Sequence, residues 1–360
     1  MAHALRNFVD RFLGRGSSAV TVPPLDGALK PNSRIEQAPP GFSIPQPDNI
    51  ALVGGTLLYS SGVQINTLDG NTVLTMAGVV TAMAASASGL LAVASQGGGI
   101  DILAGDYTRQ PVTWSDTAAL ACVTAMAFVD DRTLLVCTGS SKNGFDDWQR
   151  DLLDHGHSGA LWRLDVTTGK VAKIIGNLAF PYGVVADGDG SFIVSESWHK
   201  RLVRVSAAGK IVGQVLEDLP GYPARISGNG RGGYWLSVFA PRSQLIEFVL
   251  HEPEYRRVMM AEVDPQYWIA PALRSGVSYR EPMQGGALRQ MGILKPWAPT
   301  RSYGLVVELD GKFVPVRSLH SRADGKRHGI TSAVEQDGRL WLTSKGGDEV
   351  ISVDLDGQVD

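Results

Sequence analysis

The sequence predicts an all-β fold, a six-bladed β-propeller with a short N-terminal helix and two insertions. Two observations carry this prediction. A motif recurs five times: a short apolar strand, a turn, a second apolar strand, and a third strand after a gap. Each unit is a small antiparallel meander that cannot bury both faces alone, so the units are expected to stack radially. The five copies are Thr81 to Leu103, Thr124 to Val166, Tyr182 to Ser206, Ala224 to Val249 and Thr331 to Leu355.

The remaining elements follow from the same pattern. The second strands read LLAVAS, LLVCTG, FIVSES, YWLSVF and LWLTS, each directly after its turn. A less regular first blade fits residues 48–78, so the propeller is expected over residues 48–360. Residues 1–47 are expected to form the N-terminal helix and a Pro-rich arm. Seven prolines between Pro23 and Pro47 are expected to exclude helix from this arm.

The spacing of the copies predicts the two insertions. The starts at residues 81, 124, 182, 224 and 331 are 43, 58, 42 and 107 residues apart, and the plain interval is 42. The insertion in blade 3 covers about residues 142–159 and is expected to be helical, because Phe145, Trp148 and Leu152 share one helical face. The insertion in blade 5 covers about residues 251–301. We expect it to be partly helical and to form a lid over one mouth of the propeller.

Composition restricts the class of protein. The net charge is −3, with 44% hydrophobic and 19% charged residues, which is typical of a soluble globular protein and does not indicate a nucleic-acid partner. Cys122 and Cys137 are expected to lie out of register in their hairpin, as free thiols, which favours a cytoplasmic location. No run of 18 apolar residues indicates a membrane span.

The apolar side chains of the N-terminal segment fall on one face of a helix. They are Leu5, Phe8, Val9, Phe12 and Leu13. This face either docks on the body of the protein or makes a weak peripheral contact with a membrane. Three basic residues keep the second interpretation open: Arg6, Arg11 and Arg15.

Long stretches of blades three to six match a known family. Three stretches resemble the strictosidine-synthase-like family of six-bladed propellers: GALWRLDVTTGKVAKIIGNLAFPYGVVADGDGSFIVSESWHKRLVRV, then LPGYPARIS, and later ITSAVEQDGRLWLTS. A fourth, PDNIAL, resembles the first blade of that family. The resemblance covers about residues 20–358. More distantly, the sequence is similar to the gluconolactonase, luciferin-regenerating-enzyme and paraoxonase propellers. This resemblance implies hydrolysis of a lactone or ester with a divalent cation, usually calcium, in the central channel.

The sequence departs from the family at two of the matching metal-ligand positions. Tyr182 replaces an asparagine, and Ala224, followed by Arg225, replaces an aspartate. Asp48 remains as the candidate metal ligand, whereas a divalent cation takes six or more oxygens, several of them anionic. Arg225 and Tyr182 could instead bind a substrate carboxylate or stabilise an oxyanion. The alternative is that Arg225 faces outward.

Four residues are candidates for proton transfer. His155 and His157 lie two residues apart, so their imidazoles face the same way if the segment is extended; otherwise they are loop histidines at a helix C-terminus. Glu196 either points into the channel or pairs with Lys200 or Arg201. His328 precedes the last inner strand and is expected near the channel.

His199 and Trp148 join Tyr182 and Arg225 as candidates for substrate binding. The family resemblance, together with these residues, implies a small-molecule hydrolase whose water is activated by a carboxylate or histidine in the channel. One alternative is a Pictet–Spengler-type condensing enzyme, but Thr331 stands where the family's alkaloid-forming enzymes carry a glutamate, and threonine is no general base at neutral pH. Another is a non-catalytic propeller that binds a metabolite or a protein, which the lost metal ligands favour.

Overall fold

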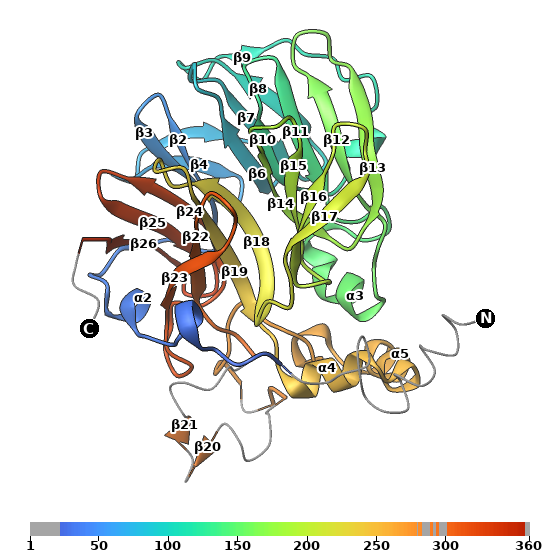
Figure 1. Cartoon of the computed structure of the whole chain (residues 1–360), viewed down its shortest axis with the longest axis vertical. Coiled ribbons are helices and arrows are strands. Elements are labelled where there is room, and N and C mark those ends of the chain that lie inside the picture. Colours follow the sequence, from blue (N-terminus) through green and yellow to red (C-terminus); the bar gives the residue numbers. More distant parts are fainter. Residues whose placement is uncertain (1–21, 279, 283–288, 291–292, 295–300, 357–360) are drawn as a thin grey trace.

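A computed structural model describes residues 22–278, 280–282, 289–290, 293–294 and 301–356. It shows six four-stranded antiparallel sheets arranged as the blades of a propeller (Figure 1). The predicted fold class is therefore confirmed. The predicted N-terminal helix, with its proposed membrane contact, lies outside the described residues. Among the described residues, no helix is long and apolar enough to cross a membrane.

The first four blades are consecutive meanders whose first strand lies nearest the axis. Blade 1 comprises β2 (Pro47–Val53), β3 (Thr56–Ser61), β4 (Gln64–Thr67) and β5 (Thr72–Thr75). Blade 2 comprises β6 (Val80–Ala85), β7 (Leu91–Ser95), β8 (Gly99–Leu103) and β9 (Arg109–Gln110). Blade 3 comprises β10 (Val123–Phe128), β11 (Thr133–Thr138), β12 (Gly159–Asp165) and β13 (Val171–Leu178). Blade 4 comprises β14 (Pro181–Ala186), β15 (Phe192–Glu196), β16 (Arg201–Val205) and β17 (Ile211–Leu216).

The sixth blade takes its outer strand from the N-terminal arm. It comprises β24 (Ile330–Gln336), β25 (Arg339–Ser344), β26 (Glu349–Asp354) and β1 (Phe42–Ser43). Phe42 pairs with Val350, so one sheet joins the two ends of the propeller and closes the ring. Gly41 permits this approach, because a Cβ there would lie 2.0 Å from the carbonyl oxygen of Val350.

The expectation of no helix in the arm is wrong. The arm contains η2 (Gly27–Leu29) and one turn of α-helix, α2 (Arg34–Gln37). Proline breaks a helix only from within it, and the segment from Arg34 to Gln37 contains none. The fully buried Ile35 anchors α2 on the body of the propeller.

Blade 5 differs from the prediction at its third strand. It comprises β18 (Gly221–Gly228), β19 (Tyr234–Pro241), β22 (Leu305–Leu309) and β23 (Pro315–His320). The apolar run expected to end this blade near residue 249 is a helix, α4 (Gln244–Leu250), and the third strand follows the insertion. Ser243 caps α4 by accepting a hydrogen bond from the Ile246 amide. A short apolar run fits a buried strand or a helix equally well, and here the cap favours the helix.

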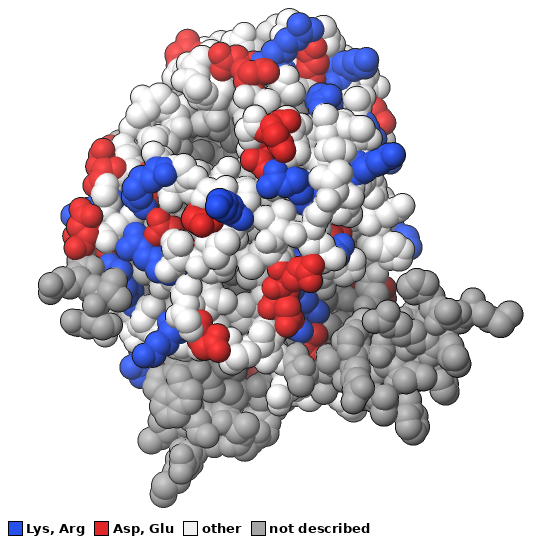
Figure 2. All heavy atoms as spheres, in the orientation of Figure 1, with Lys and Arg blue, Asp and Glu red and all other residues white. Residues whose placement is uncertain are grey.

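Both insertions lie at the same end of the blades (Figure 1). The first contains η4 (Phe145–Asp147) and α3 (Trp148–Leu153), as predicted, and the second continues with α5 (Pro253–Glu262) and η5 (Pro265–Tyr267). Their apolar side chains share one buried cluster with aromatic residues of blades 4 and 5. Cys122 and Cys137 are buried free thiols, as expected. On the face in Figure 2, acidic and basic side chains are interspersed.

Candidate active site

Six backbone irregularities encircle the axis of the propeller. Each inner strand contacts the inner strand of the next blade, and the register of each one shifts near its start. Such a bulge removes residues from the ladder and redirects their side chains and carbonyls. The residues at these bulges include Asp48, Thr81, Thr124, Tyr182, Arg225 and Thr331.

The guanidinium of Arg225 spans this ring. Its Nη1 donates to Asp48 Oδ1 (2.7 Å), to the Asp48 carbonyl (3.0 Å) and to the Thr331 carbonyl (3.3 Å), and its Nη2 donates to the Thr81 carbonyl (2.7 Å). Arg225 therefore ties blade 5 to blades 1, 2 and 6. Arg225 faces inward, so the alternative of an outward side chain does not apply.

Asp48 also binds a second cation. Lys345, directly after β25, donates from Nζ to Asp48 Oδ2 (2.7 Å). Burial raises the pKa of Asp48, but the charges and hydrogen bonds of Lys345 and Arg225 outweigh burial and lower it to about 2. Tyr182 completes the group, because its ring centroid lies 5.0 Å from the Arg225 guanidinium. We call these four residues the channel cluster.

The channel cluster does not fit the divalent cation that the fold family implies. Both oxygens of Asp48 accept hydrogen bonds from cationic side chains, and the guanidinium occupies the ring of carbonyls. A further cation at this position would meet two positive charges and no free carboxylate. Within the described part of the chain, no group of three or more His, Cys, Asp or Glu residues is arranged to hold a metal ion.

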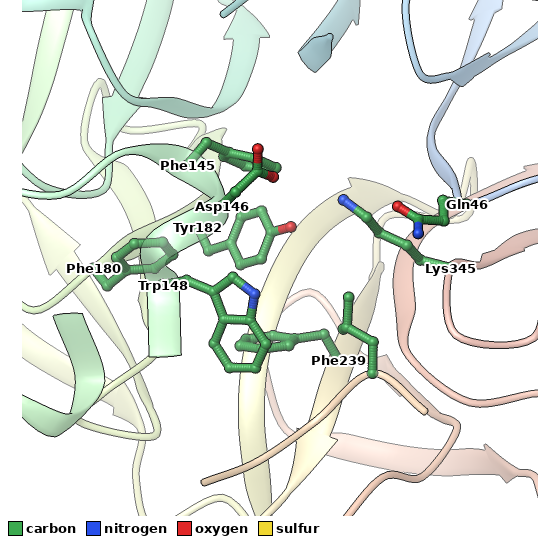
Figure 3. A pocket seen from close by; sticks show the side chains of 9 residues that line it. Gln46, Phe145, Asp146, Trp148, Phe180, Tyr182, Phe239 and Lys345 are labelled. Atoms are coloured by element: carbon green, nitrogen blue, oxygen red, sulfur yellow. The ribbon is translucent and has the colours of Figure 1, made fainter. Parts of the chain in front are cut away.

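A pocket of about 120 Å³ adjoins the channel cluster (Figure 3). Its lining comes from both insertions and from the blades, and five of the nine residues are aromatic. They are Gln46, Phe145, Asp146, Trp148, Phe180, Tyr182, Phe239, Leu273 and Lys345. The Tyr182 hydroxyl and the Lys345 ammonium group point toward one another across the pocket. The lining is therefore an apolar aromatic wall with one cationic corner.

Ring contacts hold the aromatic wall in place. Trp148 lies edge-on to Phe239, with ring centroids 5.3 Å apart, and is stacked with Trp198 at 6.3 Å. Trp198 in turn stacks on Phe180 at 4.5 Å. The buried carboxylate of Asp151 fixes this stack by accepting a hydrogen bond from Trp198 Nε1 (2.8 Å). Pre-positioned rings lose little conformational entropy when they bind a ligand.

Glu196 and His199 lie away from the pocket lining. Glu196 is buried and accepts hydrogen bonds from Arg201 Nε (2.7 Å) and from the Ala179 amide (3.0 Å). Of the two arrangements considered from the sequence, Glu196 thus adopts the ion pair with Arg201. His199 is half exposed, with Nδ1 3.5 Å from Glu196 Oε1.

The three histidine candidates are also outside the pocket lining. Both His155 and His157 are exposed. His155 donates from Nε2 to the Leu250 carbonyl (2.8 Å) and His157 donates from Nδ1 to the His155 carbonyl (3.1 Å), so the two imidazoles do not share a partner. The buried His328 uses both ring nitrogens, with Ser302 Oγ at 2.7 Å and the Arg322 carbonyl at 2.8 Å. His328 was expected near the channel, and its imidazole is held between Ser302 and Arg322 without lining the pocket.

Sequence reasoning missed Lys345, Phe239 and Asp146. One signal for Lys345 was available, because SQGG at residues 95–98 and SKGG at residues 344–347 end the second strands of two blades in the same way. Lys345 lines the pocket, and Gln96 donates from Nε2 to Asp146 (2.8 Å), which also lines it.

Comparisons with known proteins find relatives of low sequence identity and solved structures with the same fold. No family model matches it. The adipocyte plasma membrane-associated protein of Bos taurus is 25% identical over 364 residues, with 89% of this chain and 80% of the relative covered. The Salmo salar protein of the same name is 23% identical over 234 residues, and this chain spans about half of that relative (63% of this chain, 50% of the relative). The strictosidine synthase-like 13 protein of Arabidopsis thaliana is 27% identical over 169 residues, covering 44% of this chain and 42% of the relative.

Solved structures with the same fold include two gluconolactonase-type propellers. A gluconolactonase from Xanthomonas campestris superposes with a TM-score of 0.53 at 11% identity, covering 87% of this chain and 86% of that one. A putative gluconolactonase gives a TM-score of 0.52 at 12% identity, covering 88% and 89%. At these identities the likeness concerns the fold. The predicted resemblance is confirmed: by sequence the chain is similar to strictosidine synthase-like proteins and to adipocyte plasma membrane-associated proteins, and its fold is related to that of the gluconolactonase propellers.

Proposed function

We propose that the chain is a metal-independent hydrolase of small esters or lactones that react in the aromatic pocket. The observation that carries this proposal is the pair of cations, Arg225 and Lys345, held on Asp48 beside that pocket. The gluconolactonase fold of the structural neighbours supports the same reaction class, although fold alone does not determine function.

The cationic corner of the pocket suits the charge that develops during hydrolysis. As water adds to an ester carbonyl carbon, negative charge accumulates on the carbonyl oxygen. A carbonyl oxygen between Lys345 and Tyr182 would accept a hydrogen bond from each. Burial, together with the charge of Asp48, raises the pKa of Tyr182, so its phenol stays protonated and acts as a donor. Arg225 serves as a positioning residue, because it fixes Asp48 and hence Lys345.

Asp146 is the carboxylate of the pocket lining and is our candidate general base. Its side chain is oriented by the hydrogen bond from Gln96. It would take a proton from water while the water oxygen bonds to the carbonyl carbon. The bond to the leaving oxygen then breaks and that oxygen takes the proton from Asp146, which releases a carboxylic acid and an alcohol.

The test is turnover of a panel of aryl esters and lactones with and without chelator. We expect equal turnover in both conditions, and a loss of at least about tenfold in kcat/KM for Lys345→Met and for Asp146→Asn. Lys210→Met is the matched control, since Lys210 is exposed in the turn between β16 and β17. Turnover that disappears with chelator and returns with calcium would overturn the metal-independent mechanism. Absence of turnover across the panel would overturn the hydrolase.

A non-catalytic binding propeller is the second candidate. It is favoured by the lining of the pocket, in which Asp146 is the sole carboxylate and no histidine takes part. A condensing enzyme has less support, because Thr331 Oγ1 donates to the Asp48 carbonyl (2.7 Å), and the neighbouring Asp48 carboxylate is paired with Arg225 and Lys345. Ligand binding without turnover would favour the binding propeller.

A further inference from the structure

The charges of the channel cluster do not balance. One carboxylate, Asp48, is shared by two cations, Arg225 and Lys345. Asp48 and Arg225 are 3% and 8% exposed, and the Lys345 side chain is 13% exposed, so water screens the three charges poorly. Among the described residues, Asp48 is the sole carboxylate within ion-pair distance of either cation. The cluster therefore carries a buried excess of one positive charge.

A buried excess charge favours a ligand of opposite sign. Removing an ion from water costs free energy that is recovered when the ion is paired and hydrogen-bonded. The ring faces of Phe145, 5.1 Å from Lys345 Nζ, and of Tyr182 compensate for only part of this cost. An ammonium group has three N–H donors, and Asp48 accepts one hydrogen bond from Lys345. The remaining donors are available to a ligand in the pocket.

The size and walls of the pocket define the rest of the ligand. A cavity of about 150 Å³ is known to hold one benzene molecule, so a pocket of about 120 Å³ that is open on one side suits a single ring. Trp148 and Phe239 stand edge to face, which leaves aromatic surface to pack against that ring. Asp146 is exposed at the rim and is screened by water there, so it opposes a bound anion only weakly.

We propose that the pocket is an anion-binding site for single-ring aromatic monocarboxylates, with the carboxylate bound by Lys345 and Tyr182 and the ring packed against Trp148 and Phe239. This site accounts for the excess charge whether or not the chain is catalytic. One consequence rests on the proposed hydrolase. The acid released from an aromatic ester would stay bound in this site, so the enzyme would be inhibited by its own product.

The test is calorimetric titration of the full chain with benzoate at low ionic strength, with benzamide as the neutral isostere. We expect benzoate to bind at least about tenfold more tightly than benzamide, because the carboxylate forms charge-assisted hydrogen bonds. Lys345→Met should remove this preference and Lys345→Arg should retain most of it. Lys210→Met should leave it unchanged. Thermal melting of each variant separates loss of the site from loss of the fold.

Several outcomes overturn the anion site. The anion site is overturned if benzamide binds as tightly as benzoate, or if benzoate does not bind at millimolar concentration. It is also overturned if a folded Lys345→Met variant still prefers benzoate. The hydrolase fails separately. Benzoate binding without turnover of any ester supports the anion site and overturns the hydrolase, whereas turnover that benzoate does not inhibit overturns the anion site and leaves the hydrolase standing.

Discussion

Two buried clusters in this propeller have nearly the same composition and different electrostatic balance. The channel cluster contains Asp48, Arg225, Lys345 and Tyr182. A second group, the insertion cluster, contains Glu247, Arg242, Lys200 and Tyr222. In each, one buried carboxylate binds a lysine and an arginine, and the two lysine side chains are 13% and 14% exposed. The clusters are thus matched in burial and chemistry.

The difference is a second carboxylate. Arg242 also binds Asp218, with Nη1 2.5 Å from Oδ1, which makes the insertion cluster neutral. Arg225 instead binds backbone carbonyls of three blades, which leaves the channel cluster with its excess positive charge. A neutral cluster stabilises the contact between an insertion and the blades, whereas a charged cluster beside a pocket is suited to an anionic ligand.

The largest expected effect is on stability, from Arg225→Ala. This change leaves the carbonyls of Asp48, Thr81 and Thr331 without their guanidinium donor, and breaks a buried pair, which costs about 3–5 kcal/mol in the free energy of unfolding. Urea denaturation measures it. Arg242→Ala should cost less, because one of its carboxylate partners, Asp218, is exposed to water and can be solvated without it. Equal losses would contradict the role of Arg225 in linking the blades. Separately, the stability of the wild-type protein should be the same with calcium and with chelator.

The next effect separates the two lysines. Lys345→Met leaves the channel cluster neutral, whereas Lys200→Met leaves the insertion cluster with a net negative charge. We therefore expect Lys200→Met to be the more destabilising, by about 1–3 kcal/mol. Lys345→Met should instead reduce the affinity for benzoate by at least about tenfold. Urea denaturation and calorimetry of both variants give the answer, and the opposite ranking in both measurements would show that the clusters do not differ in function.

The sequence predicted the ring of the channel better than the pocket beside it. The repeat starts at Thr81, Thr124, Tyr182 and Thr331 coincide with the bulges of the inner strands, so aligning the repeats was sufficient to bring the ring residues together. The resemblance to the propeller family singled out Asp48, Tyr182 and Arg225, and the structure brings these three residues together in one channel. A repeat marks equivalent backbone positions, and side chains at those positions share one environment.

Residues outside the repeat could not be placed in the same way. The pocket wall depends on where the two insertions pack, and Leu273 and Trp148 reach it from segments that no other blade repeats. His328 directly precedes the inner strand β24, but its imidazole bonds to Ser302 and Arg322 and does not line the pocket. Proximity along the chain gave its backbone position and not the direction of its side chain.

Acid should weaken the fold through Asp48. Its pKa in the folded protein is about 2, below its ordinary value of 3.8, so between these pH values the unfolded chain binds more protons. The stabilisation is complete above pH 3.8 and is lost as the pH falls toward 2, by about 2 kcal/mol. Urea denaturation from pH 5 to pH 2 measures this loss. Asp48→Asn should reduce the slope, and an unchanged slope would show that Asp48 is not the titrating group.

The smallest effect on affinity is expected at Asp146, where one variant has two readouts of opposite sign. Removing this exposed negative charge by Asp146→Asn should tighten benzoate binding by about twofold, since a solvated charge contributes a few tenths of a kcal/mol. The gain should shrink in high salt, because exposed charges are screened. If Asp146 is the general base, the same variant loses ester turnover while it gains affinity for the acid. Loss of both would instead mean that Asp146 shapes the pocket, and loss of neither would remove it from the site.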